Sequence, residues 1–352
     1  MKTVKKPRIL YGVQSEGMGH AIRSGVVIQQ LRKKYDIIAC TSGRAYDYLR
    51  SLRIPTKGIG GFPLHYSNNR VLHTKSFLSN LLRAPREIIR SLFLLKLIDE
   101  LKPTAIISDF EPFTAYSGII KHVPVLSIDN QHLQTYTTLF NAQIRADRTI
   151  AAMIIAAAVP RATHYFILSL VPARLNNEHA TVLKPIIRNQ FFTLTPRQKN
   201  YFFAYQTSPD KNTLLEALRR LPFRFIVYGF HKNATQGNII LRSFNEKQFL
   251  RDLADCSAVI TGGNFGLLSE ALFLGKPVYC IPVEHQYEQI LSAKIIAKEG
   301  WGMYAAAFTP ATFHMFAGNL SAYRKNLACF TTSHPSSIIK PIEEKLEAIA
   351  NT

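Results

Sequence analysis

The chain alternates between short apolar runs and longer segments in which apolar residues recur at helical spacing. The first run covers 8–13, and the segment 21–35 then carries Ile22, Val26 and Leu31 on one side of a helix. Further runs of strand length follow at 36–40, 103–108, 123–128 and 163–170. The last of these is predicted to close the first sheet. Strands alternating with helices in this way predict an α/β fold with parallel sheets.

The same pattern restarts in the second half, after prolines interrupt it at Lys184-Pro185 and Thr195-Pro196. Strands are predicted there at 200–206, 223–228, 239–241, 257–260 and 278–283, with helices at 214–221, 249–254, 265–274 and 289–299. A chain of 352 residues is long enough for two domains of ordinary size. We therefore predict an N-terminal domain over 1–188, a C-terminal domain over 189–335, and a last amphipathic helix within 336–352.

The most informative stretch begins where the strand 257–260 ends. The turn Gly262-Gly263-Asn264 follows, and Glu270 lies inside the next predicted helix. A glycine pair lets backbone N–H groups approach a ligand closely, and a carboxylate one or two helical turns later can accept hydrogen bonds from a ribose. Taken alone, such a turn is as often structural as functional.

A second polar turn strengthens the indication of a ligand site. It follows the strand 278–283 and contains His285, Glu288 and Gln289. Carboxyl ends of parallel strands share one edge of a sheet, so the two turns are expected to lie together.

Polar residues also follow three predicted strands of the first half. They are Gly17, Gly19 and His20 after the first strand, Asp109 and Glu111 after the run 103–108, and Asp129 and His132 after the run 123–128. The same edge rule predicts that they converge. A histidine after a glycine loop is more often a helix-capping residue than a functional one, and that alternative stays open here.

Four segments carry a resemblance to a known family. GGNFGLLSEAL and GKPVYCIPVEHQYEQ resemble the donor-nucleotide half of the MurG-like glycosyltransferases, and DFEP and DNQH resemble a closer group of these proteins in bacteria and archaea. The resemblance implies the GT-B fold, in which two Rossmann-like domains with parallel sheets face each other across a cleft and the last helix crosses back to the first domain. It also implies inverting transfer of a sugar from a nucleotide-sugar, UDP being favoured, without a metal or other cofactor.

The resemblance assigns roles as well. It implies that Glu270 binds the ribose, that Glu288 and Gln289 contact the donor sugar, and that the loop before His20 lies at the donor's reactive end. The implied donor-binding set is Gly17, Gly19, Gly262, Gly263, Asn264, Glu270, His285, Glu288 and Gln289, and the acceptor side is Glu111, Asp129 and His132. His20 is our first choice of general base, because an imidazole works near neutral pH, and Asp109 is the second.

The acceptor is less defined. The acceptor-side loops do not match those of MurG, so a muramyl peptide acceptor is not carried over. We expect an unidentified cell-envelope glycan or lipid-linked precursor. Two alternatives remain: a UDP-sugar 2-epimerase, which shares the fold and cleaves the same bond of the donor, and a non-catalytic basic binding protein.

The composition adds a question of charge. The chain has a net charge of +20 and a pI near 9.9, yet it has no nucleic-acid-binding module. Arg83, Arg86 and Arg90 share one face of a predicted helix over 77–101, which indicates possible contact with anionic lipid or simply a surface helix. The apolar run 150–159 is too short to span a membrane and is predicted to be a buried helix.

The cysteines bear on the compartment. Cys40, Cys256, Cys280 and Cys329 are isolated in sequence, which indicates a reducing compartment and neither a zinc site nor a disulfide framework. We predict a cytoplasmic protein, in peripheral contact with the inner face of the cell membrane if the basic charge serves lipid.

Overall fold

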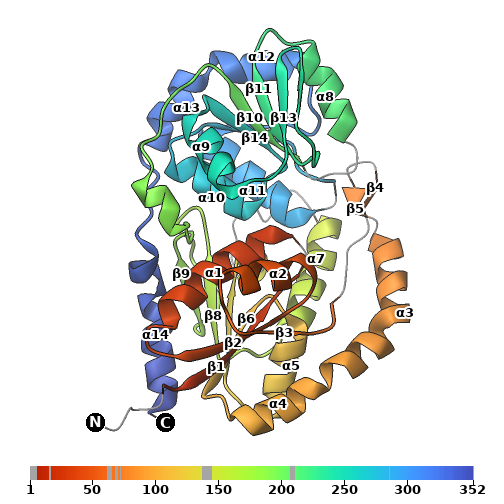
Figure 1. The fold of residues 1–352 in the computed structure, drawn as a ribbon, viewed down its shortest axis with the longest axis vertical. Coiled ribbons are helices and arrows are strands. Elements are labelled where there is room, and N and C mark those ends of the chain that lie inside the picture. The colour runs from red at the N-terminus through yellow and green to blue at the C-terminus, as the bar shows by residue number, and fades with distance from the viewer. Residues whose placement is uncertain are drawn as a thin grey trace. The chain divides into compact units, whose positions relative to one another are not determined.

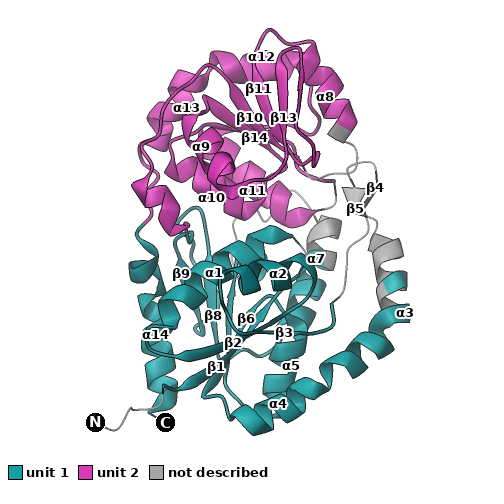
Figure 2. Ribbon diagram, in the orientation of Figure 1, with its two compact units in different colours: residues 1–64, 73–186, 333–352 teal, residues 65–72, 187–332 magenta. Residues whose placement is uncertain are grey.

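A computed structural model describes residues 6–15, 17–61, 66–67, 70–71, 73–136, 145–206, 211–284 and 286–351. The chain divides into two compact units, coloured separately in Figure 2. Unit 1 comprises residues 1–64, 73–186 and 333–352, and unit 2 comprises residues 65–72 and 187–332. The last helix, α14 (Pro335–Ala350), therefore belongs to unit 1, where Lys34 pairs with its Glu343 and Glu347 at 3.1 and 3.0 Å.

Unit 1 is built on a parallel sheet of seven strands (Figure 1). Its order is β3-β2-β1-β6-β7-β8-β9, and every adjacent pair in it is parallel. The strands are β1 (Arg8–Val13), β2 (Asp36–Thr41), β3 (Thr56–Gly58), β6 (Ala105–Asp109), β7 (Val125–Asp129), β8 (His164–Leu168) and β9 (Ala180–Leu183). All residues of β6 and β7 are buried, as expected where helices cover both faces of a sheet.

Helices connect these strands. They are α1 (Met18–Leu31), α2 (Gly43–Ser51), α3 (His73–Ser91), α4 (Phe93–Leu101), α5 (Pro112–Ile120), α6 (Leu133–Tyr136) and α7 (Arg145–Ala158). A small antiparallel pair, β4 (Tyr66–Ser67) and β5 (Arg70–Val71), precedes α3.

Unit 2 contains a second sheet, ordered β12-β13-β11-β10-β14-β15-β16. Only the edge strand β12 pairs antiparallel in it. The strands are β10 (Phe202–Tyr205), β11 (Phe225–Tyr228), β12 (Ala234–Gln236), β13 (Ile239–Arg242), β14 (Ala258–Thr261), β15 (Val278–Cys280) and β16 (Gly302–Tyr304).

The helical segments of unit 2 are η1 (Asn189–Thr193, a 3-10 helix), α8 (Lys211–Arg219), α9 (Glu246–Asp255), α10 (Phe265–Phe273), α11 (Tyr287–Lys298), α12 (Pro310–Gly318) and α13 (Leu320–Leu327). The core between this sheet and α12 contains a group of buried aromatic residues: Phe202, Phe225, Tyr279, Phe313 and Phe316.

Two parallel α/β sheets confirm the predicted fold class, and three details correct the sequence-based prediction. The run 163–170 does not close the first sheet, because β9 pairs beyond it. The segment 77–101 is not one helix, since α3 ends at Ser91 and α4 starts at Phe93. The run 150–159 lies in α7 but is only partly buried, because Met153 and Ile154 are exposed while Ile155 faces the core.

Candidate functional site

The candidate site of unit 1 is at the carboxyl end of β1. Gly17 precedes α1 with φ +79° and ψ 150°, a left-handed conformation that glycine adopts at low cost. His20 then lies in the first turn of α1. Arg23 and Ser24 follow it by three and four residues, so a helix places all three side chains on one face.

That face meets Asp109 at the end of β6. The Asp109 carboxylate is fully buried and accepts hydrogen bonds from His20 Nδ1 at 2.7 Å and from Ser24 Oγ at 2.7 Å. Arg23 holds both of its oxygens, with Nε to Oδ2 at 2.8 Å and Nη2 to Oδ1 at 2.5 Å. Burial would raise the pKa of Asp109, but the positive charge of Arg23 and the hydrogen bonds from Arg23 and His20 outweigh it and hold this pKa well below the ordinary value.

These contacts indicate which nitrogen of His20 carries the proton. A carboxylate can only accept, so the contact with Asp109 places a proton on His20 Nδ1, and in the neutral ring the lone pair is then on Nε2. Gln131 Nε2 lies 3.4 Å from His20 Nε2, on the side where that lone pair can accept. Arg23 Nη2 is also 2.8 Å from Nδ1, but both atoms are donors there and the guanidinium proton is directed to Asp109.

The loop after β7 completes this cluster. Asp129 accepts from the backbone N–H of His132 at 2.9 Å and from its Nδ1 at 2.7 Å, while the His132 ring packs 4.6 Å from the ring of Tyr165. Burial would raise the pKa of Asp129, but His132 keeps it below the ordinary value. The contact between Asp129 and His132 fixes the loop that carries Asn130 and Gln131. The side-chain oxygen of Asn130 accepts a hydrogen bond from Arg23 at 2.6 Å.

Glu111 is turned into the protein as the N-cap of α5. Its carboxylate accepts from Phe113 N at 2.9 Å and from Thr114 N at 2.7 Å. Gly12 in β1 leaves room for it, since a Cβ there would come within 2.9 Å of Glu111 Oε2. Burial raises the pKa of Glu111 to about 7, although the hydrogen bonds from Thr114 and Phe113 act in the opposite direction.

Of the predicted residues in unit 1, the structure thus brings His20 and Asp109 into direct contact. Asp129, His132 and Glu111 are almost fully buried and shape the adjoining loop and helix. Their contact with an acceptor stays a prediction.

The candidate site of unit 2 is the glycine turn after β14. Gly263 has φ +96°, and a Cβ on it would approach the backbone oxygen of Gln289 to 2.9 Å. A Cβ on Gly262 would approach Gln289 Oε1 to 2.9 Å, and that oxygen accepts from Val283 N at 3.0 Å. Both glycines are therefore required by the close packing of α11 against the turn.

The turn leads directly into α10. Asn264 caps this helix, with its side chain accepting from Leu267 N at 3.3 Å. The positive end of the helix dipole thus lies beside the glycine turn, an arrangement suited to an anion such as a diphosphate. Glu288 lies partly buried in the first turn of α11, and His285 is outside the described residues.

Glu270 in α10 is engaged by a residue that the sequence analysis did not single out. Arg188 binds its two oxygens through Nε at 2.6 Å and Nη2 at 2.8 Å. The same guanidinium reaches Glu246 at 3.0 Å and lies over the ring of Phe191 at 5.2 Å. The Arg188 and Glu270 side chains are only 4% and 8% exposed. Each carboxylate oxygen has a second lone pair, so a ribose hydroxyl can still bind there.

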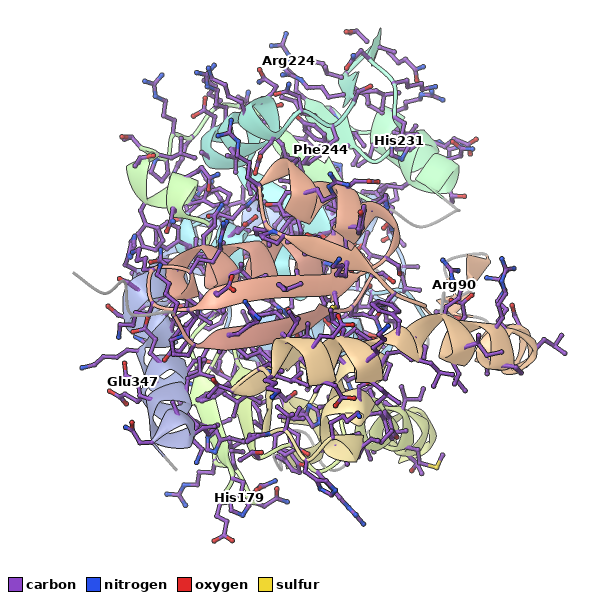
Figure 3. All side chains as sticks on the ribbon, turned by 60° about the horizontal axis from the view of Figure 1, so that its bottom comes forward. Arg90, His179, Arg224, His231, Phe244 and Glu347 are labelled. Atoms are coloured by element: carbon purple, nitrogen blue, oxygen red, sulfur yellow. The ribbon has the colours of Figure 1, made fainter. Side chains whose placement is uncertain are left out.

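A groove of about 570 Å³ lies in unit 2, next to the carboxyl end of β13. Its lining includes Asn233, Thr235, Ile240, Phe244, Asn245 and Gln248. The Phe244 ring, labelled in Figure 3, is 59% exposed and offers a stacking surface beside the groove.

Within the described residues, no group of three or more His, Cys, Asp or Glu side chains could hold a metal ion. No helix in this part of the chain is long and apolar enough to cross a membrane.

Comparisons with known proteins identify the class to which this fold belongs. A family model described as glycosyl transferase family 1 matches residues 7–321. The spinosyn forosaminyltransferase SpnP has a similar structure, with 11% identity over 97% of this chain and 99% of that chain and a TM-score of 0.67. A UDP-glucosyltransferase from Polygonum tinctorium capable of glucosylating indoxyl has 13% identity over 99% and 100% of the two chains and a TM-score of 0.69.

A third similar structure is a Streptomyces sp. SF2575 glycosyltransferase complexed with thymidine diphosphate. It has 16% identity over 96% of this chain and 99% of that chain, with a TM-score of 0.61. At these identities the similarity shows the fold, which is that of the GT-B glycosyltransferases. No curated protein matches the sequence.

The protein is therefore an enzyme of the glycosyltransferase class with the GT-B fold. The chain belongs to glycosyl transferase family 1. The finer resemblance to the MurG-like group stays an interpretation of the motifs.

Proposed function

We propose that the protein transfers a sugar from a nucleoside-diphosphate sugar to an acceptor hydroxyl, with inversion and without a metal ion. The observation that carries the proposal is the contact of 2.7 Å between His20 and the buried Asp109. The acceptor oxygen forms a bond to the anomeric carbon, the bond from that carbon to the diphosphate breaks, and His20 Nε2 takes the acceptor proton. The products are a glycoside and a nucleoside diphosphate.

Asp109 is better suited to support His20 than to act as the base itself. Its pKa is held below the ordinary value, so it is a weak base at neutral pH. Its buried negative charge can instead keep the proton on His20 Nδ1 and stabilise the imidazolium that forms during transfer.

Unit 2 supports the donor part of the proposal. Gly262, Gly263 and the N-terminus of α10 suit the diphosphate, and Glu270 is proposed to bind the ribose. The groove beside Phe244 lies at the same carboxyl edge of the sheet, where α/β proteins bind ligands, and we propose that it takes the base. A UDP-sugar is the proposed donor, with Gln289 and Glu288 toward its sugar.

The proposed acceptor is a cell-envelope glycan or a lipid-linked precursor, and the proposed place of action is the cytoplasmic side of the membrane. The basic charge of the chain supports this proposal, because such precursors carry phosphates.

The test of the mechanism is a pair of substitutions at His20. His20→Ala and His20→Asn should lower the transfer rate by about 10²–10⁴-fold, the usual worth of a general base, and change donor affinity little. Donor affinity is measured by calorimetry with UDP and turnover by release of UDP in the presence of candidate acceptors.

Other outcomes assign other roles. Near-normal turnover in both His20 variants, together with collapse in Asp109→Asn, would reverse the assignment. Loss of UDP binding in His20→Ala would make His20 a donor-binding residue. Conversion of the donor into another sugar nucleotide without an acceptor would identify a 2-epimerase.

A further inference from the structure

The outward face of α3 and α4 in unit 1 is apolar. Leu82, Ile89 and Leu92 are 77%, 66% and 52% exposed, and Ile88 and Phe93 are also exposed. Leu82 and Ile89 are seven residues apart in α3, a spacing that places them on one side of that helix. Phe93 begins α4 four residues after Ile89, and Leu92 between the two helices keeps a helical backbone (φ -59°, ψ -27°), so the same side continues into α4. A helix of a soluble domain normally presents polar residues on this side, so the face needs a partner.

The opposite side of the same helices explains their orientation. Ser91, Leu94 and Ile98 are buried, and so is Glu87, whose carboxylate accepts from Gly61 N at 3.2 Å. The inward side of the two helices thus packs against the rest of unit 1. The apolar side chains on the outward side are not part of its core.

Positive charge borders the apolar face. Arg83, Arg86 and Arg90 are exposed within α3, and Figure 3 labels Arg90 on this helix. The acidic residues near the end of α4 are matched locally, because Asp99 pairs with Lys121 at 2.5 Å and Glu100 with Lys96 at 3.8 Å. Arg90 also pairs with Glu87, at 3.4 Å, so the excess of positive charge around the apolar face comes from Arg83 and Arg86, in keeping with the chain's net charge of +20.

The neighbouring helices extend the face. Lys121 links α5 to α4, and the hydroxyl of Tyr116 in α5 donates to Ala157 O in α7 at 2.8 Å, so the three helices form one layer. Ile120 of α5 and Met153 of α7 are 58% and 60% exposed. Exposed apolar side chains thus recur across α3, α4, α5 and α7.

We propose that this layer is a membrane-docking surface that binds anionic lipid. Leu82, Ile89 and Leu92 enter the boundary between headgroups and acyl chains, and the arginines bind lipid phosphates. An apolar strip bordered by arginines suits an anionic bilayer, because insertion and charge attraction act together. A protein partner would have to match both the strip and the charge.

The test is co-sedimentation of the full chain with vesicles of phosphatidylcholine alone or mixed with phosphatidylserine, at low and high salt. Wild type should pellet with the anionic vesicles at low salt. Arg83→Glu/Arg86→Glu/Arg90→Glu should weaken this binding at least tenfold, since each basic residue near such a surface contributes about fivefold. The control, Lys232→Glu/Lys247→Glu/Arg251→Glu, removes the same charge from exposed positions of unit 2 and should bind within about threefold of wild type.

A second pair of variants tests insertion. Ile89→Ser/Leu92→Ser removes exposed apolar side chains and should weaken binding about tenfold or more without changing the urea midpoint, because neither side chain is in the core. Met315→Ser, equally exposed at 60% in α12 of unit 2, is the control.

Three results would overturn the proposal. The first is equal pelleting with neutral and anionic vesicles. The second is equal weakening by the controls and the test variants. The third is unchanged vesicle binding in Ile89→Ser/Leu92→Ser with a change of oligomeric state by light scattering, which would identify a self-association surface. None of these measurements depends on the glycosyl-transfer reaction.

Discussion

Replacing Arg188 with methionine should destabilise unit 2 by about 3–5 kcal/mol, because Glu270 would keep its negative charge in a buried position without its counter-ion. The magnitude follows from the geometry. Arg188 makes two charged hydrogen bonds to Glu270, at 2.6 and 2.8 Å, and both side chains are more than nine-tenths buried. A surface pair of the same residues would contribute at most about 1 kcal/mol.

The assay can report on unit 2 alone. Trp301 is the one tryptophan of the chain, and it is buried against Phe330 at a ring distance of 5.2 Å. Urea unfolding followed by Trp301 fluorescence should show a midpoint lower by about 1–5 M, taking a slope of about 1–3 kcal/mol per M for a domain of this size.

A matched double variant separates the buried charge from the loss of packing. Arg188→Met/Glu270→Leu removes both charges and should recover most of the lost stability, since an apolar pair of similar volume can replace a buried ion pair. Two results would show that a buried unpaired charge on Glu270 does not cause the destabilisation. One is a loss of less than about 1 kcal/mol in Arg188→Met, and the other is a double variant that is no more stable than the single one.

Two further substitutions test the glycine turn and the buried carboxylate of unit 1. Gly263→Ala should lower the urea midpoint, measured by Trp301 fluorescence, more than Gly275→Ala does. Both glycines have positive φ, but only at position 263 would the added Cβ come within 2.9 Å of backbone. Equal losses of stability would contradict this explanation. For Glu111, whose pKa is raised to about 7, the folded state keeps a proton that the unfolded state releases, so stability should fall as pH rises from about 4.5 to above 7. Calorimetric unfolding should show this slope in wild type and not in Glu111→Gln, and parallel pH profiles would refute it.

The sequence predicts the sheets because their signal is local. The apolar runs of β1, β6, β7 and β14 are flanked by turn residues and become fully or almost fully buried strands. β3, β9, β12 and β16 were not predicted, since these segments of three or four residues do not stand in a longer apolar run. The exposure of Met153 was likewise not evident, because an apolar run does not tell which of its sides is covered.

Arg23 and Arg188 show what the sequence could not supply. Each is an isolated basic residue, and such residues are usually at the surface. Their burial depends on carboxylates 86 and 82 positions away in the chain, at Asp109 and Glu270. For Arg23 a usable signal existed, because it follows His20 by three residues on the predicted helix and therefore shares its face. For Arg188 the adjacent Lys184-Pro185 break indicated only a linker.

The two histidine–aspartate pairs of unit 1 differ in access rather than in chemistry. His132 Nδ1 and His20 Nδ1 each lie 2.7 Å from a buried carboxylate, so both aspartates can fix a tautomer. The His132 side chain is 2% exposed and packs against the rings of Tyr136 and Tyr165, whereas His20 is 14% exposed at the start of a helix. A general base must reach the proton that it removes, and His20 is the more exposed of the two; an incoming hydroxyl would share its Nε2 with the amide of Gln131, 3.4 Å away. The sequence analysis chose His20 as the base and put His132 on the acceptor side, and the burial of His132 is a separate reason to propose His20 rather than His132 as the base.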